Sequence, residues 1–210
     1  MDPQMWWYLS RATGLVAWGL AVASILFGLA LASRALGPRP KAPWLLAVHR
    51  WIGGLAVLFT GAHVAAIVGD SYVHFGAADV LVPFASSWKP LPVAWGILAA
   101  WCLVAIEITS LQMKRISKRT WHAIHLTSYL VAVLATVHGF TAGADASNPI
   151  FAWAVIVAVA LMGFFAMYRR LIPKSAARAR AIRERSALPS VPLEDAKGTE
   201  PGGIGEGVGL

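Results

Sequence analysis

Four histidines lie inside apolar segments of this chain and form two spaced pairs, His49 with His63 and His125 with His138. Ionisable side chains are rare in a bilayer, and those it holds usually serve a cofactor or a transport path. At about 1.5 Å of rise per residue, an α-helix would separate the first pair by about 21 Å and the second by about 19.5 Å. Two parallel helices with these spacings would set one histidine opposite another at two depths. The pattern therefore predicts two stacked b-type haems, each with one imidazole ligand from each helix.

The directions in which these side chains leave their helices fit two stacked haems less well than their depths do. On an ideal helix of about 100° per residue, the step from His49 to His63 returns to within about 40° of the same face. The shorter step from His125 to His138 leaves those two side chains about 140° apart. We expect one of two arrangements. Either the second helix is kinked or irregular, for which the Thr127–Ser128 pair offers a cause, or the two haems approach its two flanks.

Each histidine also has a simpler interpretation. An intramembrane histidine can hydrogen-bond a neighbouring helix and do nothing more, so it is the matching depths that favour ligation. His122 lies one turn before His125 and could replace it as a ligand; we favour His125, because His122 is closer to a basic link. His74 shares a predicted loop with Asp70 and Asp79, and these three could bind a substrate iron. Solvated loop residues are the interpretation that we prefer for them.

Four other residues are candidates for contacts with a cofactor or substrate. Arg50 adjoins His49 and Arg11 opens the first apolar stretch, and guanidinium groups fit the carboxylates of haem propionates. Ordinary anchoring at the membrane interface explains both arginines equally well. Gly53 would let a macrocycle lie against the backbone, although close helix packing accounts for it nearly as well. Glu107, in the third stretch, either pairs with a basic residue, extends toward the interface, or serves proton or quinol chemistry.

The elements that must position these residues are helices that cross a membrane. The chain has 210 residues, of which 58% are hydrophobic and 13% charged, and its mean hydropathy is +0.63. Such a composition excludes an ordinary water-soluble domain. Five apolar stretches are long enough to span about 30 Å of hydrocarbon. We therefore predict an all-α integral membrane protein, a five-helix bundle with helices at about 12–33, 44–69, 93–113, 121–143 and 150–172.

The distribution of charge predicts how the bundle is oriented. Basic residues gather after the first, third and fifth stretches, whereas the other links hold several aspartates and few basic residues. The positive-inside rule then places the N-terminus and an external segment, 1–10, outside and the C-terminus in the cytoplasm. The net charge of +8 follows from this asymmetry and does not indicate a nucleic-acid partner. We expect a multi-pass domain at 11–172 in a bacterial plasma membrane, and a basic and then disordered tail at 173–210.

The segments that carry the histidines also resemble a known family. The matching residues are His49-Arg50 with Gly53 and His63, then Trp121-His-Ala-Ile-His125-Leu-Thr-Ser-Tyr129 with His138, and also Ser10-Arg11-Ala-Thr-Gly14 and Pro83-Phe84. In this pattern the chain resembles the ferric-reductase-like transmembrane domain family. That group includes NADPH oxidases, ferric reductases and the haem-binding membrane subunit of bacterial periplasmic methionine sulfoxide reductase. The resemblance covers roughly residues 6–172. It implies that His125 supplies the inner ligand and that electrons cross from the cytoplasm to the outside.

These observations lead to one predicted function and to stated alternatives. We expect a b-type membrane cytochrome with two haems, held by His49–His125 and His63–His138, that reduces an external acceptor. The segment after the fifth stretch is short and has no dinucleotide-binding motif, so we expect a separate flavoprotein or quinol as the donor. The alternatives are one haem instead of two, a quinol-linked cytochrome b subunit of a periplasmic oxidoreductase, or a non-redox membrane protein with structural histidines. Whether the chain is an enzyme by itself, and its oligomeric state, stay open.

Overall fold

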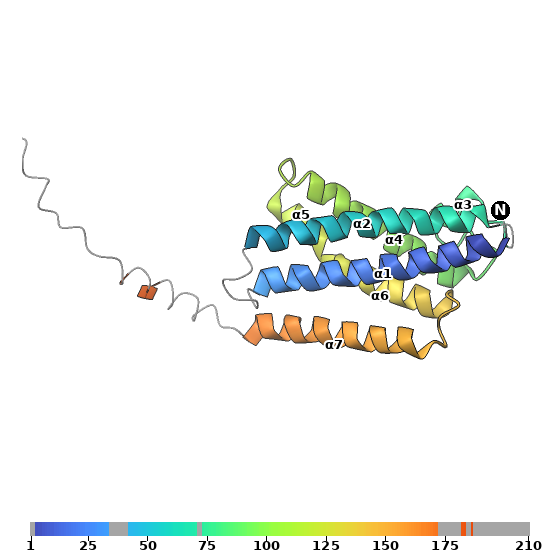
Figure 1. Cartoon of the computed structure of the whole chain (residues 1–210). Coiled ribbons are helices and arrows are strands. Elements are labelled where there is room, and N and C mark those ends of the chain that lie inside the picture. The colour runs from blue at the N-terminus through green and yellow to red at the C-terminus, as the bar shows by residue number, and fades with distance from the viewer. Residues whose placement is uncertain (1–2, 34–41, 71–72, 172–181, 184–185, 187–210) are drawn as a thin grey trace, which may run out of the picture. The chain divides into compact units, whose positions relative to one another are not determined.

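The structure is a computed structural model, and it describes residues 3–33, 42–70, 73–171, 182–183 and 186. Within these residues the secondary structure is helical and contains no strand (Figure 1). The helices are α1 Pro3–Ser33, α2 Ala42–Gly69, α3 Ala77–Leu81, α4 Pro90–Leu111, α5 Lys118–Leu126, α6 Ser128–Thr141 and α7 Pro149–Leu171. The predicted basic and disordered tail at 173–210 falls almost wholly outside the described residues.

Five spans are long and apolar enough to cross a membrane, which confirms the predicted fold class. They are Gln4–Ser33, Pro43–Gly69, Pro90–Leu111, Lys118–Thr141 and Pro149–Leu171. Many of their large apolar side chains are exposed, such as Leu58 at 64% and Trp153 at 66%. In water such exposure would be costly, but in lipid the outer faces of the helices need no protein cover. The exposed apolar surface is therefore a property of a membrane protein.

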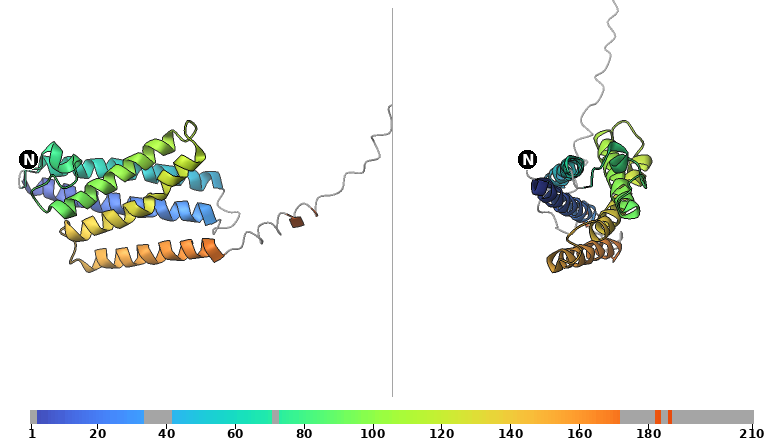
Figure 2. Two further views of the ribbon diagram at one scale, coloured as in Figure 1. Left: turned by 180° about the vertical axis from the view of Figure 1, so that it is seen from behind. Right: turned by 90° about the vertical axis from the view of Figure 1, so that its right-hand side faces the viewer.

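Helix α1 lies at the centre of the packing. It contacts α2, α6 and α7, while α4 contacts α5 and α6 (Figure 2). A small core forms where Ile25 and Leu29 of α1 meet Ala132 of α6, and side chains of α7 pack against it. The indole Nε1 of Trp18 donates a hydrogen bond to Thr136 Oγ1 at 2.9 Å, which ties α1 to α6. These contacts hold α6 and α7 against α1, while α2 packs along α1, and α4 packs on α6 and α2.

The fourth span is interrupted at Thr127, which lies between α5 and α6. Its backbone N–H donates to the carbonyl of Ile124 at 3.0 Å, and its hydroxyl donates to the same carbonyl at 2.6 Å. Both bonds span three residues, so they tighten the backbone and compete with the regular α-helical pattern. The first of the two predicted arrangements, an irregular fourth helix, is therefore confirmed.

The helix boundaries differ from the predicted ones at several ends. Helix α1 begins at Pro3 and not near Ala12, because proline suits a first helical turn and the residues that follow it are largely apolar. The fourth span begins at Lys118, where the Ser117 side chain accepts a hydrogen bond from the N–H of Thr120. The link between α2 and α4 contains α3, a five-residue helix that was not predicted.

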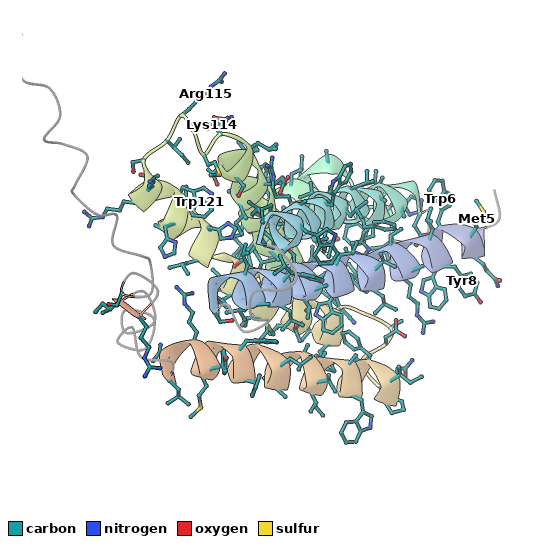
Figure 3. The ribbon with its side chains drawn as sticks, turned by 60° about the vertical axis from the view of Figure 1, so that its left-hand side comes forward. Met5, Trp6, Tyr8, Lys114, Arg115 and Trp121 are labelled. Carbon is teal, nitrogen blue, oxygen red and sulfur yellow. The ribbon has the colours of Figure 1, made fainter. Side chains whose placement is uncertain are left out.

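The two ends of the bundle carry different side chains. Figure 3 shows Lys114 and Arg115 at the turn between α4 and α5, at the opposite end from Met5, Trp6 and Tyr8 on α1. The turn thus lies at the end of the bundle where α1 ends and α2 begins, and α3 lies at the other end. Four of the basic residues that the sequence analysis used to orient the chain lie in this turn and in the first residues of α5: Lys114, Arg115, Lys118 and Arg119.

Candidate cofactor-binding site

The His63 pair, by which we mean His63 and His138, joins α2 to α6. The two ring centroids are 6.3 Å apart and the ring planes are inclined at 83°. The Nδ1 atom of His63 lies 2.7 Å from the carbonyl oxygen of Ser10, and that of His138 lies 2.8 Å from the carbonyl oxygen of Pro92. A carbonyl oxygen only accepts hydrogen bonds, so each Nδ1 donates. Each Nε2 then keeps the lone pair that a metal requires.

The His49 pair, by which we mean His49 and His125, joins α2 to α5. Its ring centroids are 5.9 Å apart with an interplanar angle of 70°. The Nδ1 atom of His49 donates to the carbonyl oxygen of Ser24 at 2.9 Å, and the hydroxyl of Ser24 lies 3.2 Å away. The Nδ1 atom of His125 is buried and has no hydrogen-bond partner among the described residues. Its ring instead stacks on Trp121, with centroids 4.9 Å apart.

The separation of the rings fits a single metal atom between them. A metal–nitrogen bond of about 2.0 Å, with about 1.1 Å from that nitrogen to the ring centroid, sets two opposed imidazoles about 6.2 Å apart. The centroid distances of 5.9 and 6.3 Å lie close to this value. A bare metal ion would need more ligands than two. The described residues contain no group of three or more His, Cys, Asp or Glu side chains placed for that. The donor set therefore fits a metal whose remaining ligands belong to a cofactor.

Glycines on α1 make room for two of the four imidazoles. A Cβ atom on Gly14 would lie 2.8 Å from His63 Nδ1, and one on Gly28 would lie 3.3 Å from His49 Cε1. Each ring thus packs directly on the helix backbone. The sequence analysis named Gly14 only as part of a family motif, did not name Gly28, and assigned neither glycine to the site. The signal was present, because Gly14 and Gly28 have the same fourteen-residue spacing as His49 and His63.

A third glycine, Gly96 of α4, plays the same part for His138. A Cβ atom at this position would lie 2.7 Å from Nδ1 of the imidazole, a distance that real Cβ atoms do not reach. A side chain here would push the ring away from α4 and break its bond to Pro92. Glycine is thus needed for close approach at this position, and not for flexibility of the helix.

A cavity of about 520 Å³ lies beside the His63 pair. Such a volume is typical of cofactor sites. Both imidazoles of the pair line it, together with mostly apolar side chains from α1, α2, α4 and α6. Four charged residues also contribute to the lining: Arg11, Asp70, Lys89 and Asp145. The cavity can therefore enclose an apolar group that has a charged edge.

Arg11 lines this cavity, but its charge is already paired. Its Nε donates to Asp145 Oδ2 at 2.7 Å, and its Nη2 donates to Oδ1. Asp145 is only 6% exposed, and the guanidinium group lowers the pKa of its carboxyl below the ordinary value. Asp145 was not among the predicted site residues, since it is 134 residues away in the chain. A second cation, Lys89, lies over the Trp88 ring and donates to the carbonyl of Thr141 at 3.3 Å.

The other residues near the His49 pair lie in different settings. Arg50 is exposed on α2. Gly53 faces α4, because a Cβ atom there would lie 3.6 Å from Glu107 Oε2 and 3.7 Å from the Ser24 hydroxyl. Of the two histidines weighed for the inner position, His125 is the one opposite His49, whereas His122 is exposed.

The candidate iron site in the link between α2 and α4 has no such order. His74 is exposed and has a positive φ of 55°. The Asp79 carboxylate accepts a hydrogen bond from the N–H of Gly76 at 2.8 Å, so it caps α3. Only His74 has the exposed loop position of the preferred interpretation, because Asp79 is half-buried in α3 and Asp70 is half-buried and lines the cavity at the His63 pair.

Comparison with known proteins gives one match. The family model described as "Ferric reductase like transmembrane component" matches residues 13–136, which is more than half of the chain. The matched segment contains His49, His63 and His125 and ends two residues before His138. No curated protein and no solved structure matches the chain.

Proposed function

The chain belongs to the ferric-reductase-like transmembrane family, and from this membership we propose that it carries electrons across a membrane through two b-type haems. His49 and His125 would hold one haem, and His63 and His138 the other. The observation that carries the proposal is the geometry of the four imidazoles. They meet in two pairs at separations that suit one metal atom each. The family match alone supports membrane electron transfer and leaves the number of haems open.

A haem iron with two imidazole ligands is a one-electron carrier, whose potential depends on its ligands, its burial and nearby hydrogen bonds. The protein's share of the work is positioning. The carbonyl groups of Ser10, Ser24 and Pro92 hold three imidazoles in the tautomer that directs Nε2 to a metal. The fourteen-residue step along α2 from His49 to His63 would set the two sites one after the other across the bilayer. With two imidazoles for each metal atom, the chain would leave no ligand position for a substrate, so an acceptor would receive electrons without binding the metal.

The propionates of each haem would need cationic partners. Arg11 and Lys89 line the cavity at the His63 pair, so they are the partners that we propose there. Because Asp145 already neutralises the charge of Arg11, Lys89 would attract a haem propionate more strongly than Arg11 would. At the other end, Arg50 adjoins His49, and Gly53 lies one turn further along α2. We keep both as candidates for contact with the haem of the His49 pair.

The direction of transfer follows from the charge distribution. By the positive-inside rule, the basic residues at the turn between α4 and α5, and those in the sequence between α1 and α2, would put the end with this turn in the cytoplasm. The His49 pair would then be the inner site, accepting electrons from a cytoplasmic flavoprotein or from quinol. The His63 pair would be the outer site, facing an external acceptor. This orientation sets the chain in a bacterial plasma membrane with its N-terminus outside.

The first experiment is a count of haem per chain. Detergent-purified protein is measured by the pyridine haemochrome method and by a reduced-minus-oxidised spectrum. We expect two b haems per chain in the wild type, about one in His63→Ala, and two in the control His74→Ala, which changes an exposed histidine. Wild-type protein without haem, after expression with adequate haem supply, would exclude the proposed function and favour a membrane protein with structural histidines. A single haem in the wild type that is retained in both His63→Ala and His138→Ala would restrict the function to the His49 pair.

One observation favours quinol over a flavoprotein as the donor. The Glu107 carboxylate lies inside the third span, beside Gly53, Gly54 and the Ser24 hydroxyl that contacts His49. A carboxylate at this depth could accept the proton that a quinol releases on oxidation. Reduction of the haems by a quinol analogue should then be slower in Glu107→Gln, while reduction by dithionite should be unchanged. Equal rates with the quinol analogue would favour the flavoprotein.

A further inference from the structure

Three of the four imidazoles are held by one and the same backbone device. In each case Nδ1 donates to a helix carbonyl oxygen, and the residue four positions later is a glycine on which the ring packs. Residues four apart lie on the same face of a helix, so the missing Cβ lets the ring reach the carbonyl. We call this combination a cradle. The three cradles are Ser10 with Gly14 for His63, Ser24 with Gly28 for His49, and Pro92 with Gly96 for His138.

The cradles follow a fixed register along the helices. On α1, Gly14 and Gly28 are fourteen residues apart, which matches the spacing of the histidines that they face on α2. On α4, the same step from Gly96 leads to Ser110, one residue before the helix ends. Helix α4 contacts α5 as well as α6 in this structure, and α5 carries His125. The fourth cradle would thus consist of Ile106 and Ser110.

Three buried side-chain polar atoms at this end of the bundle have no hydrogen-bond partner within the part of the chain that the structure describes. They are Ser110 Oγ of α4, and Trp121 Nε1 and His125 Nδ1 of α5. Buried polar atoms without partners are rare and need an explanation. For His125 Nδ1, the fourteen-residue spacing of the cradles supplies such an explanation. A Cβ atom at Gly96 would lie 2.7 Å from His138 Nδ1, so a side chain at the equivalent position keeps the ring from the carbonyl.

We propose that Ser110 is a positioning residue that occupies the fourth cradle and leaves His125 as the one haem ligand without a backbone acceptor. This inference rests on the proposed function, because His125 must be a ligand for its support to matter. A ligand imidazole whose Nδ1–H is hydrogen-bonded is more basic and more firmly oriented. The haem at the His49 pair should therefore be bound less tightly through His125 than through His49. A weaker donor also stabilises the ferric state less, which raises the midpoint potential of that haem.

The test restores the missing glycine in the full-length, haem-loaded protein. Ser110→Gly removes Cβ and the hydroxyl, whereas the matched control Ser110→Ala removes the hydroxyl and keeps Cβ. Two quantities are measured in each variant: the rate of haem transfer to apomyoglobin, and the midpoint potentials of both haems by spectroscopic titration. In Ser110→Gly we expect one haem to leave about tenfold more slowly, as is typical for a gained partner of a metal ligand. The midpoint potential of that haem should fall.

Ser110→Ala should match the wild type in both measurements, and the second haem should be unchanged in every sample. Equal shifts in Ser110→Gly and Ser110→Ala would overturn the inference, because the hydroxyl and not Cβ would then be the determining group. Unchanged haem transfer and potentials in Ser110→Gly would overturn it as well. In both of these cases the wild type still contains two haems, so the proposed function stands. Wild-type protein without haem would instead overturn the proposed function and this inference together.

Discussion

The two histidine pairs lie on the same helical framework but are supported differently. In the His63 pair, both imidazoles donate to backbone carbonyls, at 2.7 and 2.8 Å, and both pack on glycines. In the His49 pair, His49 has this support, while the Nδ1 atom of His125 has no partner among the described residues. The support of an imidazole on one helix thus comes from the backbone of a neighbouring helix. In the proposed explanation, a side chain in place of glycine on that neighbour removes the support from His125.

The largest expected effect comes from filling a tight cradle. Gly14→Ala places a methyl group 2.8 Å from His63 Nδ1, so the ring must leave the carbonyl of Ser10. We expect the purified protein to lose one of its two haems, as His63→Ala does, in a pyridine haemochrome measurement. Gly19→Ala is the control on the same helix, because nothing lies within 4 Å of a Cβ there. Equal haem content in the two variants would show that the cradle does not govern ligation.

A smaller effect is expected at the looser cradle. Gly28→Ala would bring Cβ to 3.3 Å from His49 Cε1, a contact that a shift of a few tenths of an ångström relieves. The haem of the His49 pair should therefore stay bound but transfer to apomyoglobin about tenfold faster than in the wild type. If Gly28→Ala lost its haem as completely as Gly14→Ala, the two ends of α1 would be equally rigid. The distinction between a tight cradle for His63 and a looser one for His49 would then be wrong.

The smallest effect concerns the ion pair at the His63 end. The pKa of Asp145 is lowered by Arg11, so the pair stabilises the fold above the carboxyl's ordinary pKa of about 3.9. That contribution disappears as the pH falls through the lower value in the folded protein. We expect Asp145→Asn to lower the melting temperature modestly at neutral pH and to have no effect at a pH below both values. Thermal unfolding of haem-free protein in detergent measures this, without interference from ligand protonation.

An unchanged melting temperature at neutral pH would show that the ion pair contributes nothing to stability. The control is Asp79→Asn, which alters a carboxylate that caps the short helix α3 and forms no ion pair among the described residues. The spectrum of the haem at the His49 pair should be the same in both variants, because Arg11 and Asp145 lie at the other end of the bundle.

Much of the fold could be predicted from local pattern. Five long apolar segments require five spans in any arrangement, because unsatisfied backbone groups are not tolerated in lipid. The fourteen-residue spacing of His49 and His63 also placed them on one face of α2 before any helix was packed. The helix boundaries were less predictable. A cap such as Ser117 or an early proline such as Pro3 extends a helix beyond its apolar run.

What the sequence determined by itself is the number of spans, the depths of the four histidines and the alternative of an irregular fourth span. Only the tertiary structure decided which imidazoles meet. The interruption at Thr127 separates the helix of His125 from that of His138, so both can face α2. It also decided that Arg11 pairs with Asp145 and that the backbones of α1 and α4 hold three of the four imidazoles. The physical reason is that periodicity is a property of one helix, whereas a cradle or an ion pair requires two segments to approach each other.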